Sequence, residues 1–233
     1  MEKSHGVVIV EGLIGVGKST LTEALAAQLG GEFIAEPDEK TNPFLALYYQ
    51  DPARWSYTMQ SHLLSCRYRA HLYAQSRVLH GRDTWVCMDR SFFGDSCFAR
   101  VQKKLGYFCD AEYESYFRMH KDYQTHILYP TVAIFLHATP ETCAKRIDRR
   151  ISEKEGRKCE SGIDIGYLSM LDQEINVLEK ELANRGVSVI SLDWDGELDG
   201  DGIQKAAAEL AARVQNCVPC EHETWTGIGG RGA

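Results

Sequence analysis

The fold is decided by residues 7–20, which read Val7-Val8-Ile9-Val10-Glu11-Gly12-Leu13-Ile14-Gly15-Val16-Gly17-Lys18-Ser19-Thr20. Residues 7–10 form a short apolar, β-branched run, which is typical of a buried strand in a parallel sheet. Residues 12–19 fit the pattern G-x-x-x-x-G-K-[ST], and a stretch of helical character, residues 19–29, follows directly. A strand, a glycine-rich turn and a helix in this order predict a site for the phosphates of a nucleotide.

Each residue type in this turn has a chemical purpose. Glycines let backbone N–H groups turn toward a phosphate without obstruction, and the start of the helix adds a dipole that favours anions. Lys18 can place its charge on the β- and γ-phosphates, and the Ser19 hydroxyl can ligate Mg²⁺. The motif alone does not separate kinases from GTPases or ATP-driven machines. The predicted phosphate-binding residues are Gly12, Gly15, Val16, Gly17, Lys18, Ser19 and Thr20.

The composition limits the classes of protein to be considered. The chain has 233 residues, 44% apolar and 25% charged, so we expect one globular domain over residues 1–216. A net charge of −7 argues against a general binder of nucleic acid polymers or membrane surfaces. No apolar run approaches the roughly 20 residues that span a bilayer, and no secretory signal is visible. We therefore expect a cytoplasmic protein with reduced thiols.

The last residues, 217–233, are expected to form a flexible tail. Cys217, Cys220 and His222 lie in it, but a structural zinc site normally takes four ligands, so a single C-x-x-C is insufficient. We assign this tail no function.

Apolar and helical patterns alternate along the rest of the chain. Strands that alternate with helices predict an α/β fold in which helices cover both faces of a parallel sheet. We expect a mostly parallel sheet of five strands. The predicted strands are 7–10, 32–35, 85–88, 132–137 and 187–192, and the predicted helices are 19–29, 52–80, 111–127, 166–184 and 202–214, with another helix beginning near 139–141.

Two acidic motifs follow predicted strands. Glu36-Pro37 ends the second strand, and in open α/β sheets the carboxyl ends of strands face the ligand crevice. A carboxylate there could accept the proton of an attacking hydroxyl, or it could simply mark the exit of the strand into a loop. Asp89-Arg90-Ser91 follows the third strand. Asp89 could hold Mg²⁺ or its water and Arg90 a phosphate, or the two could form a structural ion pair.

A basic segment stands out in this acidic chain. Arg146, Arg149 and Arg150 are followed by Lys154, Arg157 and Lys158. Arginines about one helical turn apart can close over a triphosphate as a lid and stabilise charge on the transferring group. The alternative is a solvated helix face, and the phosphate motif favours the lid.

Taken in order, these residues resemble the deoxynucleoside kinase family, which includes deoxycytidine, deoxyguanosine and deoxyadenosine kinases. The resemblance runs from about Val7 to Val214, and residues 42–60 look similar to bacterial purine deoxynucleoside kinases. It implies a P-loop kinase fold with an arginine-rich lid at about residues 146–163. It further implies ATP as phosphate donor, Mg²⁺ as cofactor, and a homodimer.

The resemblance also implies catalytic roles. Glu36 matches the general base that takes the proton of the 5′-hydroxyl. Arg90 matches the arginine that steadies the 5′-oxygen and the phosphates, and Asp89 occupies the acidic position beside it, a position for Mg²⁺ or its bound water together with Ser19. Lys18 completes the predicted catalytic set. The predicted lid arginines are Arg146, Arg150 and Arg157.

The substrate-binding roles follow in the same way. Gln60 matches an amide that binds the base edge, and an amide offers both a donor and an acceptor. Arg67 and Asp95 match a charged pair found in members that accept purines or cytosine. Tyr49, with Glu160 as its partner, matches the residue that contacts the 3′-hydroxyl of the sugar.

Two departures from the family pattern affect these roles. Residues 151–156 are an apparent insertion between Arg150 and Arg157, and Arg149 could take the place of Arg150. The aromatic residue that stacks on the base should lie four residues after Asp95, where Ala99 stands, so Phe98 is the candidate one position earlier.

The resemblance predicts ATP-dependent phosphorylation of the 5′-hydroxyl of a deoxynucleoside, with deoxyadenosine or deoxyguanosine favoured. One alternative is a nucleoside monophosphate kinase similar to thymidylate kinase, which would need a cationic site for the acceptor phosphate. The other is a non-catalytic regulator that binds ATP only as a ligand.

Overall fold

A single five-stranded sheet forms the centre of the protein. The computed structural model describes residues 5–37, 41–81, 84–152, 163–197 and 199–217. The strands lie in the order β2-β3-β1-β4-β5, and all four pairings are parallel, as the alternating pattern predicts. Their bounds are β1 Gly6–Gly12, β2 Glu32–Ile34, β3 Trp85–Asp89, β4 Val132–His137 and β5 Ser188–Asp193.

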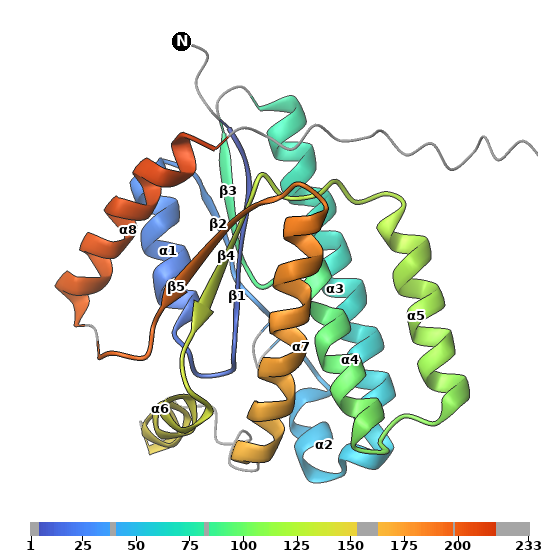
Figure 1. The fold of residues 1–233 in the computed structure, drawn as a ribbon. Helices are drawn as coiled ribbons and strands as arrows, with labels where there is room; N and C mark the ends of the chain where they lie inside the picture. The colour runs from blue at the N-terminus through green and yellow to red at the C-terminus, as the bar shows by residue number, and fades with distance from the viewer. Residues whose placement is uncertain (1–4, 38–40, 82–83, 153–162, 198, 218–233) are drawn as a thin grey trace, which may run out of the picture.

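Helices cover both faces of this sheet. In Figure 1, α1 and α8 pack together on one face, and α3, α4 and α7 pack on the other with α5 outside them. The bounds are α1 Lys18–Leu29, α2 Leu45–Gln50, α3 Pro52–His80, α4 Phe92–Lys104, α5 Asp110–Gln124, α6 Pro140–Ser152, α7 Ile165–Asn184 and α8 Gly200–Gln215. None of these helices in the described part of the chain is long and apolar enough to cross a membrane.

The central position of β1 explains its sequence. All seven of its residues are buried, since β3 and β4 flank it and helices cover both faces. Branched apolar residues suit such a strand because both of its faces are in the core. The carboxyl end of β1 leads into the phosphate motif, and α2 and α6 lie at this end of the sheet (Figure 1). The site is therefore expected at this edge.

Two helices were absent from the sequence prediction. The short α2 precedes α3, and α4 begins directly after Asp89-Arg90-Ser91. Ser91 is the N-cap of α4, and its Oγ accepts hydrogen bonds from the backbone N–H groups of Phe93 and Gly94 at 3.1 and 3.2 Å. Serine is a strong N-cap residue, so this signal was present in the sequence, although Gly94 in the first turn lowers helix propensity.

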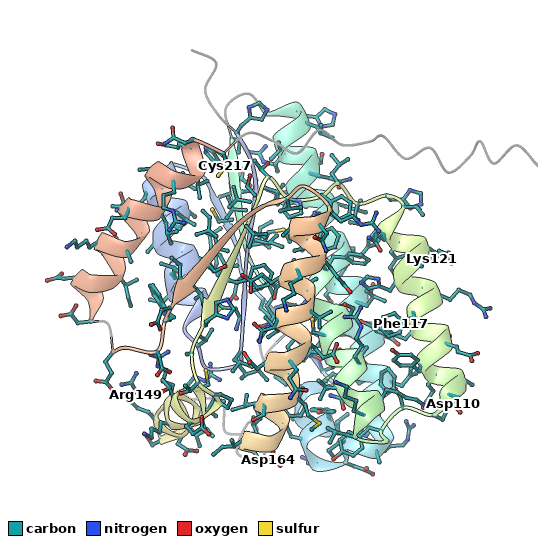
Figure 2. The ribbon with its side chains drawn as sticks, viewed as in Figure 1. Asp110, Phe117, Lys121, Arg149, Asp164 and Cys217 are labelled. Carbon is teal, nitrogen blue, oxygen red and sulfur yellow. The ribbon has the colours of Figure 1, made fainter. Side chains whose placement is uncertain are left out.

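Helix α5 lies on the outer side of α3 and α4. Figure 2 places Asp110, Phe117 and Lys121 along α5, away from Arg149 and Asp164, which lie where α6 ends and α7 begins. Two histidines are buried between α3, α4 and α5. Burial lowers the pKa values of His71 and His120 to about 4, against the smaller effect of their hydrogen bonds to backbone carbonyls. Both rings therefore pack as neutral groups at physiological pH.

Candidate active site

The phosphate motif forms a turn that only glycine can make. Gly12, Gly15 and Gly17 have φ angles of 151°, 81° and 104°, in a region that side chains disfavour. A Cβ on Gly15 would lie 2.7 Å from the carbonyl oxygen of Cys143 in α6, so the turn also packs directly against that helix. Gly17 is the N-cap of α1 and supplies no side-chain acceptor, which leaves the first N–H groups of the helix available to an anion.

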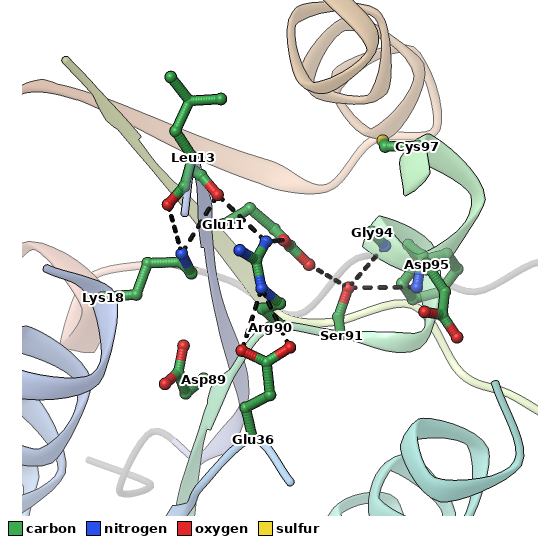
Figure 3. A network of polar contacts seen from close by, with 12 residues as sticks. Glu11, Leu13, Lys18, Glu36, Asp89, Arg90, Ser91, Gly94, Asp95 and Cys97 are labelled. Atoms are coloured by element: carbon green, nitrogen blue, oxygen red, sulfur yellow. Dashed lines mark hydrogen bonds and ion pairs between the residues drawn. The ribbon is translucent and has the colours of Figure 1, made fainter. Parts of the chain in front are cut away.

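Lys18 points back over this turn. Its Nζ donates to the carbonyl oxygens of Gly12 and Leu13 at 3.2 and 2.6 Å (Figure 3). Burial lowers the pKa of Lys18 to about 8, and the charge of Arg90 acts in the same direction against the nearby carboxylates. The ammonium therefore lies in a poorly solvated place where a phosphate would stabilise its charge.

Ser19 and Asp89 provide oxygen ligands suited to a magnesium ion. The Ser19 hydroxyl donates to Oδ2 of Asp89, while Oδ1 of Asp89 is buried without a partner in the described part of the chain. Mg²⁺ binds hydroxyl and carboxylate oxygens and keeps several water or phosphate ligands, so these two residues fit such an ion. Within the described residues, no group of three acidic, histidine or cysteine side chains offers another metal site.

Glu36 lies between two arginines. Its Oε1 accepts a hydrogen bond from Nη2 of Arg67, and Nε of Arg90 lies 3.2 Å from both of its oxygens. Burial raises the pKa of Glu36, but the charges of Arg90, Arg67 and Lys18 outweigh that effect and bring it to about 2. The carboxylate is therefore ionised and ready to accept a hydrogen bond.

Arg67 connects Glu36 to α4. Its guanidinium also donates to Oδ1 of Asp95, whose second oxygen is buried without a partner among the described residues. The ring of Phe98 lies beneath both arginines, 5.7 Å from the guanidinium carbon of Arg67 and 4.7 Å from that of Arg90. Both Phe98 and Ala99 belong to the hydrophobic core, but only Phe98 lines the cavity described below.

Apart from Asp89, Asp95 and Ala99, the side chains described so far line one cavity of about 1000 Å³. The phosphate turn, including Val16, Ser19 and Thr20, forms one wall. Arg90 connects this turn to Glu36, and Glu36 connects to Arg67 on α3, where the opposite wall begins. That wall is mostly aromatic and apolar. It contains Asn42, Leu45, Tyr48, Tyr49, Met59, Gln60, Leu63, Phe98 and Tyr167.

Gln60 is the main polar group in this wall. It is fully buried, and both atoms of its side-chain amide lack a hydrogen-bond partner in the described part of the chain. Nδ2 of Asn42 is likewise buried and unpaired there. Buried polar groups are nearly always satisfied in proteins, so these atoms indicate a ligand with complementary donors and acceptors.

Three of the arginines considered for the lid line the cavity. Arg146 lines the cavity, and its guanidinium donates to backbone carbonyls, at 3.1 Å to Val16 of the phosphate turn and at 3.0 Å to Trp194 after β5. Arg149 and Arg150 also line the cavity. Arg157 lies outside the described residues. So does Glu160, the partner expected for Tyr49.

Sequence reasoning missed Glu11 entirely. This residue is 1% exposed, and its carboxylate lies behind Arg90, where it accepts a hydrogen bond from the Ser91 hydroxyl (Figure 3). Burial raises its pKa, against the opposing charge of Arg90. The signal was available in the sequence, since an acidic residue inside an apolar buried strand needs a partner.

Residues 8–219 match the family described as deoxynucleoside kinase. The chain belongs to this family. It is 33% identical over 189 residues to the deoxyguanosine kinase of Dictyostelium discoideum, a match that covers 81% of this chain and 64% of that protein. It is 27% identical over 199 residues to a deoxyadenosine kinase of the same organism, covering 85% of this chain and 76% of that one.

A solved structure has the same fold. The deoxyadenosine kinase of M. mycoides with bound dATP superposes with a TM-score of 0.72, covers 90% of this chain and 98% of its own, and is 23% identical. The P-loop kinase fold expected from the sequence is therefore confirmed.

Proposed function

We propose that this protein transfers the γ-phosphoryl group of ATP to the 5′-hydroxyl of a deoxynucleoside. One observation carries the proposal: a single cavity holds the phosphate turn on one side, the unpaired amide of Gln60 on the other, and the ionised carboxylate of Glu36 between them. This arrangement suits a triphosphate that meets an uncharged alcohol.

Glu36 acts as the general base in this proposal. In the free protein three cations hold its pKa at about 2, which makes it a weak base. The phosphates of ATP would draw on the charges of Lys18 and Arg90, so the basicity of Glu36 rises when ATP is bound. The carboxylate then orients the 5′-hydroxyl and accepts its proton as the phosphoryl group departs from the β-phosphate.

The phosphate side supplies charge stabilisation. The amides of the turn and Lys18 bind the phosphates, and the lid arginines Arg146, Arg150 and Arg157 complete the set. Ser19 and Asp89 would hold Mg²⁺, directly or through water, and the ion would neutralise charge that develops on the phosphoryl oxygens. Little covalent chemistry is required of the protein, because positioning and electrostatics dominate phosphoryl transfer.

The opposite wall favours a purine. Gln60 offers a donor and an acceptor, Arg67 offers donors, and the free oxygen of Asp95 offers an acceptor to the edge of a base. Phe98 provides an aromatic face, and Tyr49 with Glu160 would contact the 3′-hydroxyl. The names of the two Dictyostelium relatives, a deoxyguanosine and a deoxyadenosine kinase, support the same preference.

A nucleoside monophosphate kinase is less compatible with this site. Such an enzyme needs a free cation for the acceptor phosphate, but Arg67 is already paired with Asp95 and Glu36. Their carboxylates would repel a phosphate placed there. A regulator without catalysis is equally disfavoured, because it would have no use for an ionised carboxylate next to Lys18 and Arg90.

The test is a substrate panel with Mg-ATP. The four deoxynucleosides and their monophosphates are offered to the wild type, Glu36→Gln and Glu32→Gln. Glu32 is a matched control because it pairs with Arg77 at the surface, away from the cavity. We expect phosphorylation of a purine deoxynucleoside, a loss of about 10²- to 10⁴-fold in Glu36→Gln, and no loss in Glu32→Gln. Equal turnover by Glu36→Gln would remove the general base from the proposal.

The homodimer implied by the resemblance stays a prediction. On α3, Tyr73 and Leu79 are 52% and 65% exposed, so this helix offers apolar surface to a second copy. Light scattering coupled to size-exclusion chromatography measures the mass directly, and a monomer at micromolar concentration would contradict the prediction.

A further inference from the structure

Glu11 is a buried acid that the proposed reaction does not use. It is the penultimate residue of β1, directly before the phosphate turn, and the described lining of the cavity does not include it. A carboxylate is costly to bury among apolar strand residues unless its neighbours compensate for the lost water. Its contacts therefore identify its role.

The first contact of Glu11 is with the start of α4. Oε1 accepts a hydrogen bond of 2.6 Å from the hydroxyl of Ser91. That hydroxyl oxygen already accepts from the N–H groups of Phe93 and Gly94, so its one proton is directed to Glu11. A Cβ on Gly94 would overlap the Glu11 carboxylate, which shows how closely the helix approaches it.

The second contact is with Arg90. Oε2 of Glu11 lies 3.9 Å from Nη1 of Arg90, on the guanidinium opposite the cavity carboxylate Glu36. Nη1 also donates to the carbonyl oxygen of Gly12 at 3.1 Å. The backbone of Arg90 has a φ of 65°, the left-handed region, which is uncommon for a residue with a side chain. A conformation of this kind persists only where surrounding contacts hold it.

Through these two contacts Glu11 affects both partners of the candidate general base Glu36. Arg90 binds Glu36 directly, and α4 carries Asp95, which binds the Glu36 partner Arg67. Glu11 and Glu36 attract Arg90 from opposite sides. Without the charge of Glu11, the attraction of Glu36 would be unopposed and would draw the guanidinium toward the cavity. The base would then be paired more tightly and displaced from the alcohol.

We infer that Glu11 is a positioning residue for phosphoryl transfer: it holds Arg90 and the start of α4 from behind, so that Glu36 keeps its place and its basicity. This inference rests on the proposed function, because it assigns Glu11 an effect on the chemical step. The side chain touches neither substrate, so its loss should change turnover more than binding.

The experiment compares two buried carboxylates. Glu11→Gln keeps the volume and an acceptor for Ser91 but removes the charge. Glu174→Gln is the matched control, since Glu174 is 7% exposed and pairs with Lys104 and Arg100 between α4 and α7, outside the cavity. We expect Glu11→Gln to lower kcat by about 100-fold, the scale of a small misplacement of reacting groups, with the KM of each substrate nearly unchanged. Glu174→Gln should lower thermal stability and leave kcat intact.

A spectroscopic measurement separates positioning from general destabilisation. The Nε–H signal of Arg90 in ¹⁵N-labelled protein, assigned by its absence in Arg90→Lys, should shift and exchange faster with solvent in Glu11→Gln. It should stay in place in Glu174→Gln. Folded Glu11→Gln with wild-type kcat, or with an unmoved Arg90 signal, would overturn the inference.

Two further outcomes are decisive. If Glu11→Gln does not fold, Glu11→Asp retains the charge and should fold with a smaller loss of kcat; failure of both variants to fold would show that Glu11 acts only in folding. If the wild type phosphorylates no deoxynucleoside, the proposed function fails, whereas wild-type kcat in Glu11→Gln against an active wild type overturns only the role of Glu11.

Discussion

Lys18 should take up a proton when ATP binds. Its pKa is lowered from 10.5 to about 8 in the free protein, because it is buried and lies near Arg90. At pH 8 about half of the molecules therefore carry a neutral lysine, and near pH 9 about nine in ten do. Bound phosphates stabilise the charged form and raise the pKa again, so the missing proton must come from solvent on binding.

Calorimetry measures this proton directly. The binding enthalpy of Mg-ATP is recorded in buffers of different ionisation enthalpy, and the slope gives the protons taken up. We expect below about 0.1 proton near pH 7, about 0.5 near pH 8 and about 0.9 near pH 9. The Kd for ATP should rise about tenfold for each pH unit above about 8, by linkage.

An arginine at this position supplies the control. Lys18→Arg stays charged at every pH in this range, so its proton uptake should be close to zero and its Kd independent of pH. Negligible uptake by the wild type near pH 9 would refute the argument. Equal uptake in both proteins would assign the proton to another group.

Three other substitutions test the proposed base contact, the proposed magnesium site and the burial of a histidine. Gln60→Leu should raise the KM for the deoxynucleoside by about 10- to 100-fold, the cost of two lost hydrogen bonds, with the KM for ATP unchanged in steady-state kinetics. Asp89→Asn should raise the Mg²⁺ concentration for half-maximal activity by about tenfold, and an unchanged Mg²⁺ titration would argue against the metal site. His120 has a folded pKa of about 4 against 6.5 in the unfolded chain, so it stabilises the fold fully above pH 6.5 and loses this stabilisation as pH falls toward 4. The variant His120→Phe keeps the stacking on Phe92 but cannot take up a proton. As pH falls from 6.5 to 4, its free energy of unfolding in urea should rise relative to that of the wild type by up to about 3 kcal/mol. Parallel curves of unfolding free energy against pH would contradict this.

The sequence predicted the sheet well because its signals are local. A β-branched run marked β1, alternation of short apolar runs with helical stretches marked the other strands, and the helix predicted over residues 52–80 agrees with α3 at both ends. The signal for α4 was weaker, because Gly94 is a poor helix former and Ser91 was interpreted only as part of an acidic motif. Gly94 is required there by its approach to Glu11, a contact between residues far apart in sequence.

The candidate site was predictable where residue type and position sufficed. Glu36, Arg90, Gln60, Arg67 and Asp95 all come together as the resemblance implied. The sequence pattern could not show that the guanidinium of Arg146 contacts backbone carbonyls or that Glu11 lies behind Arg90. Both facts depend on contacts between residues far apart in the sequence. Arg157 and Glu160 lie outside the described residues, so their roles stay predictions.

The left-handed backbone at Arg90 is a local strain that the ion pairs of its side chain outweigh. Glycine or asparagine would adopt a φ of 65° at lower cost, and the relief is of the order of 1 kcal/mol. Removing the guanidinium would, however, leave the buried carboxylates of Glu11 and Glu36 without their shared cation, at a cost of about 3–5 kcal/mol. Selection for heat resistance and selection for activity would therefore both retain this arginine. A library that aims at both properties should hold residue 90 constant and look for stability elsewhere.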